Sequence, residues 1–272
     1  MRQKICRTRL GHIVIRRELV SRQIIYGSLA QQLTRYMVAV IAFIIISGAD
    51  IQGAHADSLP DVAGEIGLVS TANAAFSPGH KVAGLFGSRE TSSSNLTPFT
   101  KWTSMYARFE ADIHDAQYSR VLKKWQNDLR PLAHLPVREM AQRVNDMMNA
   151  HPYIHDDAHV WGVTDYWETP LEFLAHNGDC KDYAIAKYAS LRMLGVPEDH
   201  LRIAIVQDLK KHLPHAIVLL YTDDNDTLIL DNQNQRVLSS SSVFSYKPIF
   251  SINRTAWWLN RVPGTAVLAL AD

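Results

Sequence analysis

Three side chains in the second half of the sequence have the types and the order of a thiol-based catalytic triad. Cys180 precedes an amphipathic run, His215 opens a β-rich run, and Asp231 ends the next β-rich run. A thiol nucleophile needs a base, and the base needs an acceptor that orients it. These residues therefore predict covalent catalysis, in which Cys180 attacks a carbonyl after its proton has passed to His215, and Asp231 holds the imidazole.

The run that follows Cys180 predicts a helix that begins beside the thiol. Asp179 is a favourable N-cap, and Gly195 at the end of the run is a stop signal. The unpaired N–H groups and the dipole at a helix start stabilise a thiolate, so they lower the pKa of a cysteine there. Asp179 and Asp182 act in the opposite direction, and the neighbouring Lys181 could help to offset them.

The sequence changes from a helical to a strand-like period after this helix. Four short β-rich runs cover residues 201–207, 215–221, 227–231 and 246–252. The acidic stretch 223–226 predicts a hairpin turn between the second and third runs. If these runs pair through that turn, residues 217–221 face residues 227–231 in reverse order. His215 and Asp231 are then at the same end of the hairpin.

The segments before Cys180 predict the helical layer of the fold. Apolar residues recur at intervals of mostly three and four in 99–130, which indicates one long helix or two stacked pieces. The same spacing predicts a second helix over 137–148, whereas 151–170 has the composition of a loop. Helices followed by strands indicate an α+β fold in which N-terminal helices pack on one side of an antiparallel sheet.

The N-terminal part of the chain has the pattern of an export signal. Residues 1–56 hold eight of the 28 Lys and Arg residues but two of the 27 Asp and Glu residues. A basic stretch, the apolar run 37–47 and the sequence Ala54-His55-Ala56 follow in the order of a secretory signal peptide, which predicts cleavage after Ala56. An uncleaved membrane anchor is the alternative.

The rest of the chain divides into two further segments. Residues 57–97 are rich in Gly, Ser and Ala without sustained periodicity, which predicts a flexible lead-in, and residues 98–272 are expected to form the catalytic domain. Residues 57–272 carry a net charge of −5, so a nucleic-acid-binding surface is not expected. Removal of residues 1–56 would leave Cys180 as the one cysteine, and a single thiol in an exported chain is a buried filler or a reactive group.

The block 161–197 and two later runs, PHAIVLLY and LILDNQNQ, carry a resemblance to a known family. Over residues 99–260, the sequence resembles the bacterial transglutaminase-like cysteine peptidases. The resemblance implies a transglutaminase-like fold related to that of papain. It also implies that Cys180 is the nucleophile, His215 the base and Asp231 the third member of the triad.

The resemblance further implies a substrate, partners and a compartment. Family members are periplasmic peptidases that release giant surface adhesins by cutting near the adhesin N-terminus at a dialanine site, which controls biofilm attachment. A membrane receptor for cyclic di-GMP can sequester them, and calcium is needed for their activity. We therefore expect a large adhesin as protein substrate, an inner-membrane cyclic di-GMP receptor as partner, and calcium as cofactor.

Calcium is also expected from the residues beside the thiol. Asp179 and Asp182 flank Cys180 and supply the hard oxygen ligands that calcium prefers, and a cation there would offset their effect on the thiolate. Family members often carry an acidic residue directly after the cysteine, whereas this chain has Lys181, which removes a possible ligand and adds a positive charge. Each aspartate also has a purely structural role open to it, as the N-cap for Asp179 and as a complement to the helix dipole for Asp182.

The other site residues also have structural interpretations. Cys180 could be a buried thiol, and His215 could be a histidine at the edge of a strand. Asp231 could be a turn-capping aspartate, with Asn232 as an alternative orienting group. Two other functions stay open: a transglutaminase that transfers the acyl group to an amine, and a catalytically idle module that binds an adhesin or receptor segment in the groove.

Overall fold

The structure is a computed structural model that describes residues 59–68, 76–77, 84–155 and 157–261. The chain divides into two units, Met1–Gln52 and Gly53–Asp272, and every described residue belongs to the second. The predicted signal peptide, residues 1–56, lies outside the described residues. Within them, no helix combines the length and the hydropathy of a membrane-spanning segment.

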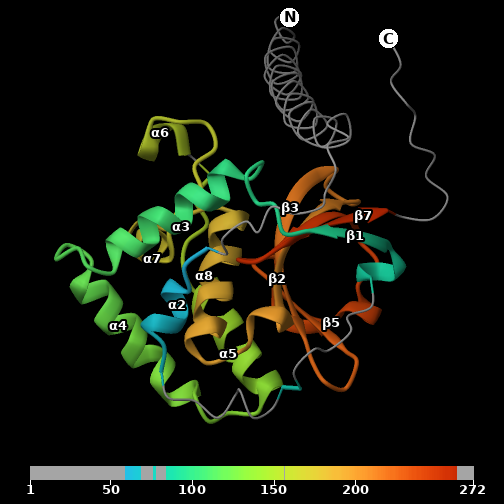
Figure 1. Ribbon diagram of the computed structural model, residues 1–272, viewed down its shortest axis with the longest axis horizontal. Helices are drawn as coiled ribbons and strands as arrows, with labels where there is room; N and C mark the ends of the chain where they lie inside the picture. The colour runs from blue at the N-terminus through green and yellow to red at the C-terminus, as the bar shows by residue number, and fades with distance from the viewer. Residues whose placement is uncertain (1–58, 69–75, 78–83, 156, 262–272) are drawn as a thin grey trace, which may run out of the picture. The chain divides into compact units, whose positions relative to one another are not determined.

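A seven-stranded sheet forms the centre of the second unit (Figure 1). The strands lie in the order β1-β7-β6-β2-β3-β4-β5, and all neighbouring pairs are antiparallel. Their bounds are Arg89–Ser93 (β1), Leu201–Asp208 (β2), Leu213–Tyr221 (β3), Thr227–Asp231 (β4), Asn234–Ser239 (β5), Tyr246–Ile252 (β6) and Trp257–Arg261 (β7). The central strands β2 and β3 are buried at nearly every position, because protein covers both faces of the sheet there.

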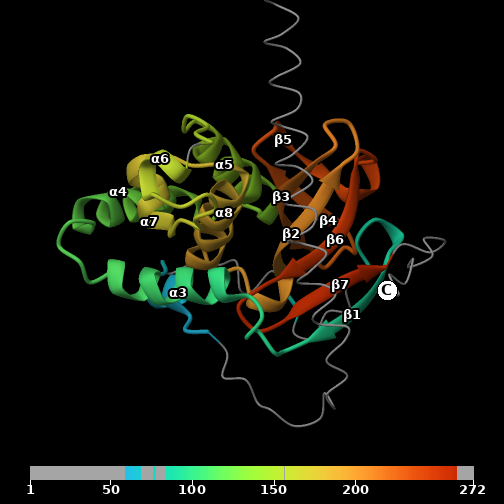
Figure 2. The same cartoon turned by 90° about the horizontal axis from the view of Figure 1, so that it is seen from above.

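The helices of the described residues gather on one side of this sheet (Figures 1 and 2). Their bounds are Val62–Glu65 (α2), Thr100–Asp112 (α3), Ser119–Leu129 (α4), Val137–Asn149 (α5), Asp157–Trp161 (α6), Pro170–His176 (α7) and Cys180–Met193 (α8). Single turns of 3-10 helix cover Leu85–Gly87 (η2), Arg130–Leu132 (η3), Glu198–His200 (η4) and Ser240–Ser242 (η5). α8 packs against β2, β3 and β4 and also contacts α2, α5 and α7.

α8 is buried on almost every side, and a capping box sets its first turn. The Asp179 side chain accepts a hydrogen bond from the backbone N–H of Lys181 at 3.1 Å, and the Asp182 side chain accepts one from the backbone N–H of Asp179 at 3.0 Å. Two orphan donors of the helix start are satisfied in this way. The helix start, and Cys180 with it, is therefore held at a defined place against the sheet.

An apolar cluster packs across the middle of the sheet. Its buried members are Leu85, Ala204, Val206, Ile217, Leu219, Tyr221, Ile229, Val243 and Tyr246. The members from β2 and β3 are alternate residues, which is the period of a strand with one face turned toward a core. The apolar runs that predict these strands are thus the residues that build this core.

The α+β fold predicted from the sequence is confirmed, with helices on an antiparallel sheet. The region 99–130 forms two helices, because Asp115 in the link accepts a hydrogen bond from the backbone N–H of Gln117 at 2.8 Å, and such local turns compete with a helix. The helix predicted over 137–148 is α5. The four predicted strands are β2, β3, β4 and β6.

The expected flexible lead-in contains an edge strand of the sheet. Within residues 57–97, Arg89–Ser93 form β1, which pairs with β7 from the other end of the described chain, and Leu85 is buried in the core. The prediction of a flexible segment is wrong for these residues. Their sequence is polar and lacks apolar alternation, so it does not predict a strand. Such a sequence can form β1 because β1 lies at the edge of the sheet, is largely exposed and takes its backbone partner from a distant segment.

The region expected to be a loop before Cys180 contains α6, and α7 follows it directly. The Thr169 hydroxyl accepts a hydrogen bond from the backbone N–H of Glu172, and the Glu172 side chain accepts one from the backbone N–H of Thr169, with Pro170 in the first turn. Both helices are too short to show a period, so caps and neighbours determine them. β5 and β7 are also absent from the prediction, because each is short and mixes polar with apolar residues.

Candidate active site

The two predicted partners of the thiol meet at one end of the β3–β4 hairpin. Val218 pairs with Leu230, so the predicted register of this hairpin is confirmed. His215 Nε2 lies 2.8 Å from Asp231 Oδ1, and both side chains are almost fully buried. A carboxylate in this position fixes the orientation of the ring.

Asp231 is held as a carboxylate by the groups around it. Besides the imidazole, its donors are the Tyr246 hydroxyl at 2.6 Å, the backbone N–H of Gln233 at 2.8 Å and the side-chain amide of Asn234 at 3.0 Å. Burial acts to raise the pKa of Asp231, but the hydrogen bond and charge of His215, together with Tyr246 and the Gln233 N–H, lower it to about 2. The carboxylate therefore keeps a proton on Nε2 of His215 and leaves Nδ1 as the basic nitrogen.

Cys180 is the first residue of α8 and is partly exposed. The thiol and the imidazole line one cavity of about 340 Å³. The residues around that cavity are Tyr153, Cys180, Lys211, His215, Asn232 and Gln233. The structure thus brings the predicted nucleophile to the His215–Asp231 pair.

The electrostatic surroundings of the thiol differ from the sequence-based expectation. The protein packed around the sulfur, followed by the charge of Asp179, raises the pKa of Cys180 to about 12, although the Ala216 N–H and Lys181 act to lower it. The expected lowering of the pKa is therefore wrong for this conformation, because loss of water outweighs the helix start. The resting sulfur is a thiol, and its proton has to move during the reaction.

Gln233 is a residue of the site that the sequence analysis does not single out. Its side-chain nitrogen lies 3.2 Å from His215 Nδ1, the ring nitrogen that does not face Asp231. With Nε2 protonated, Nδ1 accepts and the amide donates. Gln233 lies two residues after Asp231, so its place follows from the turn that ends β4. That position in the turn is the signal that could have pointed to it.

Tyr153 is a second residue that the sequence analysis misses. Its side chain lines the cavity beside Cys180, and its ring stacks against Tyr183 with 6.2 Å between centroids. Tyr153 reaches this place because it forms an isolated parallel bridge with Gly178. No local pattern in the sequence predicts that bridge, since it joins a loop to the residue two before the thiol.

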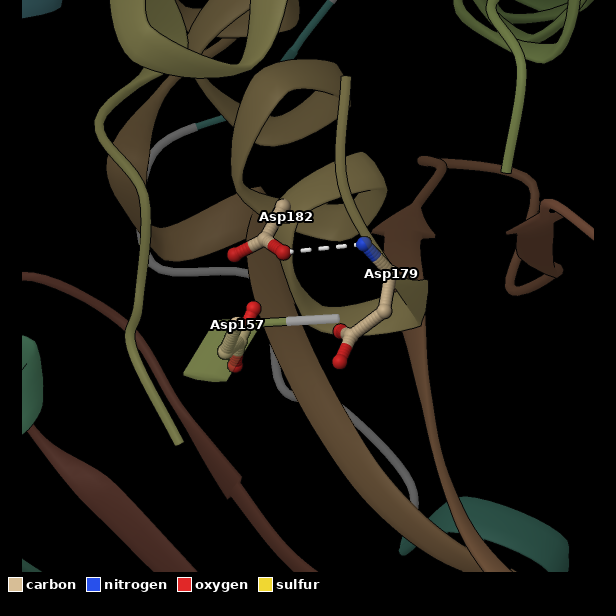
Figure 3. Close-up of side chains that lie close together, drawn as sticks. All are labelled: Asp157, Asp179 and Asp182. Atoms are coloured by element: carbon tan, nitrogen blue, oxygen red, sulfur yellow. Dashed lines mark hydrogen bonds between the residues drawn. The ribbon is translucent and has the colours of Figure 1, made fainter. Parts of the chain in front are cut away.

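Three aspartates converge beside the start of α8 (Figure 3). Ligand atoms of Asp157, Asp179 and Asp182 all lie within 4.8 Å of one another. The predicted pair from α8 is thus joined by Asp157 from α6, which the sequence analysis does not include. Lys181 Nζ lies 2.7 Å from Asp179 Oδ2, 2.9 Å from Asp157 Oδ2 and 3.5 Å from Asp182 Oδ2. The ammonium therefore lies among the three carboxylates.

Residues 119–262 match the model of a family described as bacterial transglutaminase-like cysteine proteinase. The match spans more than half of the chain and includes Cys180, His215 and Asp231. The chain belongs to this family. It is therefore a cysteine peptidase, and its α+β fold is the transglutaminase-like one that the sequence predicts.

Solved structures of LapG from Legionella pneumophila are similar to the chain. One is 33% identical, covers 53% of this chain and 81% of LapG, and has a TM-score of 0.47. The EGTA-treated form is 32% identical, covers 54% of this chain and 80% of LapG, and has a TM-score of 0.47. The calcium-bound form is 32% identical, covers 61% of this chain and 85% of LapG, and has a TM-score of 0.46. No curated protein sequence matches the chain.

In this chain, the three aspartates Asp157, Asp179 and Asp182 do not fit a calcium ion as they stand. Both oxygens of Asp182 accept backbone N–H groups, from Glu168 and from Asp179, at 3.0 Å each. Asp157 Oδ2 accepts the backbone N–H of Tyr166 at 2.9 Å as well as the Lys181 ammonium. Calcium takes roughly six to eight oxygen ligands, whereas these oxygens are turned toward nitrogen donors and enclose a cation of the chain itself.

Proposed function

We propose that the chain is a periplasmic cysteine endopeptidase in which Cys180, His215 and Asp231 form the catalytic triad. One observation carries the proposal: the His215 ring, held by Asp231 at 2.8 Å, lines the same cavity as Cys180, a partly exposed residue. Cys180 is also the one cysteine within the family match. A peptidase of this family that acts through a thiol therefore has a single candidate here.

The geometry suggests a defined path for the proton. Asp231 holds the proton on His215 Nε2, so Nδ1 accepts the thiol proton as the sulfur of Cys180 bonds to the scissile carbonyl carbon. The imidazolium then protonates the leaving amine, the C–N bond breaks, and a thioester remains. Water attacks the thioester while His215 accepts its proton, which releases the acid and restores the thiol.

Two N–H donors lie near the thiol and suit the oxyanion of this reaction. One is the backbone N–H of Cys180 at the start of α8, and the other is the side-chain amide of Gln233. In the structure the Gln233 amide donates to His215 Nδ1 at 3.2 Å. Bound substrate therefore has to replace this contact, which frees Nδ1 for the thiol proton.

The substrate that we propose is the N-terminal region of a large surface adhesin, cut at a dialanine site. Cleavage there would release the adhesin and end biofilm attachment, and an inner-membrane cyclic di-GMP receptor would control access by sequestering the peptidase. Family membership supports this assignment. The predicted export signal in residues 1–56 agrees with a periplasmic site of action.

The test is cleavage of N-terminal segments of large adhesins encoded in the same genome. The purified chain is incubated with each segment, in the presence of calcium or of a chelator, beside the Cys180→Ala variant. We expect a specific cut that the variant does not make, with a dialanine at the new ends. Cleavage that persists in Cys180→Ala would contradict the triad, and incorporation of a labelled amine without a cut would favour acyl transfer.

A further inference from the structure

The side chain of Lys181 and the three carboxylates around it form a closed ionic cluster. The lysine and the three aspartates each expose 10% of their side chains or less. An ammonium has three N–H donors. Here each of the three aspartates places one oxygen within 3.5 Å of the nitrogen. The number of donors and the number of carboxylates are therefore matched.

Buried carboxylates in this position require a cation. Removing an anion from water costs free energy unless a partner compensates for the lost hydration. His155 Nδ1 lies 3.4 Å from Asp179 Oδ2, but its side chain is 77% exposed, so water weakens that contact. Lys181 supplies its charge from inside the cluster, where the surroundings screen it least.

A calcium ion and this ammonium compete for one place. Calcium would need the same three oxygens at about 2.3–2.6 Å, and Lys181 Nζ already contacts two of them at 2.7 and 2.9 Å. Both cations together would repel each other at very short range. Calcium could bind only if the lysine left the cluster and lost its three ion pairs, with no new ligand from residue 181.

We propose that Lys181 is a tethered cation that takes the place of a bound calcium ion, so that the chain keeps its site geometry without a metal. Two of its partners, Asp179 and Asp182, form the capping box of α8, and the third, Asp157, belongs to α6. The ammonium thus ties α6 to the turn that carries Cys180. This role separates the chain from a relative whose structure is calcium-bound.

The wild-type chain provides the first test. Thermal unfolding is followed in millimolar calcium and in chelator, and calcium binding is measured by titration calorimetry. We expect the same unfolding midpoint in both conditions and no heat of specific binding. A midpoint that rises in calcium by about 5 °C or more, as a saturated site would produce, would overturn the proposal.

The Lys181→Glu variant provides the second test. It replaces the tethered cation by a further carboxylate, so the variant should unfold at a lower temperature in chelator and recover by about 5 °C or more in calcium. Lys124→Glu is the matched control, because Lys124 is 77% exposed and pairs with Asp128 at 2.6 Å. This control should show no response to calcium.

The outcomes separate clearly. If the Lys181→Glu variant folds without calcium and its unfolding temperature does not change in calcium, the assigned role of the lysine is contradicted. A variant that folds only in calcium would support that role. If the variant does not accumulate in either condition, the wild-type titration decides. These readouts are unfolding and metal binding, so they stand or fall independently of the proposed peptidase substrate.

Discussion

At the scale of single residues, the site combines a well-held base with a thiol that is not ionised at rest. Asp231 orients His215, and its low pKa keeps the carboxylate charged across the physiological range. Cys180 is in the opposite state, since its surroundings raise the pKa of the thiol. The pair therefore suits proton transfer during attack better than a thiolate–imidazolium pair formed beforehand.

Alkylation of Cys180 tests this description. The pKa of the thiol lies near 12, above the usual value, so the thiolate fraction should rise about tenfold per pH unit from neutral to strongly alkaline pH. The rate of iodoacetamide labelling should rise in parallel, and Cys180→Ala reports any labelling of Cys6. A rate that is already level at neutral pH would show a preformed ion pair with His215 instead.

At the scale of elements, α8 carries a chain of buried polar groups behind the catalytic pair. The Lys187 ammonium donates to the Asn145 side chain at 2.8 Å, and the same amide oxygen accepts the backbone N–H of Asp231 at 3.1 Å. Burial lowers the pKa of Lys187 to about 7, although the charge of Asp231 acts to raise it. The network connects α5 and α8 to the end of β4.

The pH dependence of stability should reveal Lys187. Its folded pKa of about 7 lies below that of the unfolded lysine, so between these values the unfolded chain binds a proton that the folded chain does not. Lys187 therefore makes the free energy of unfolding rise with pH from about 7 to about 10.4, by roughly 1 kcal/mol per pH unit. As the pH falls from about 10.4 to about 7, this gain in the free energy of unfolding is lost, and below about 7 Lys187 adds no further pH dependence.

Denaturant unfolding of wild type and Lys187→Met at several pH values measures this contribution. The difference between the two curves isolates the lysine, because the tyrosines and other groups titrate in both. We expect the free energy of unfolding of wild type to increase relative to that of the variant as the pH rises from neutral to alkaline. A difference that does not change with pH would mean that Lys187 is already charged, or already solvated, in the folded protein.

At the scale of the whole second unit, the sheet joins segments from both ends of the described chain. β1 lies before α3 and the later helices, and β7 follows all other strands, yet they pair side by side. Ser88 donates a buried hydrogen bond to Asn260 at 2.7 Å, and Leu85 packs into the cluster of β2 and β3. Residues 85–93 are therefore part of the folded body.

Truncation of Leu85 tests this assignment. Leu85→Ala should lower the free energy of unfolding by about 2–4 kcal/mol, because it empties a well-packed position of the core. Leu209→Ala is the control, since Leu209 is 46% exposed and should cost less than about 1 kcal/mol. Equal effects in thermal or denaturant unfolding would mean that the segment does not dock on the sheet.

The hairpin that aligns His215 with Asp231 could be predicted from the sequence because its determinants are local. Short continuous apolar runs specify β3 and β4, and the acidic turn between them sets how they pair. The N-cap at Asp179 likewise specifies where α8 begins. The type, order and pairing of the main site residues therefore follow from short-range patterns.

Only the tertiary structure decided what surrounds these residues. Asp157 of α6 joins the acidic pair, and Tyr153 lines the cavity beside Cys180, through contacts that have no period and no fixed spacing in the sequence. The pKa of Cys180 is also a tertiary property, because it depends on how much water the packed neighbours remove. Local rules determined which groups face each other across a hairpin, whereas the charge state of the thiol and the cation among the aspartates depend on distant segments packed together.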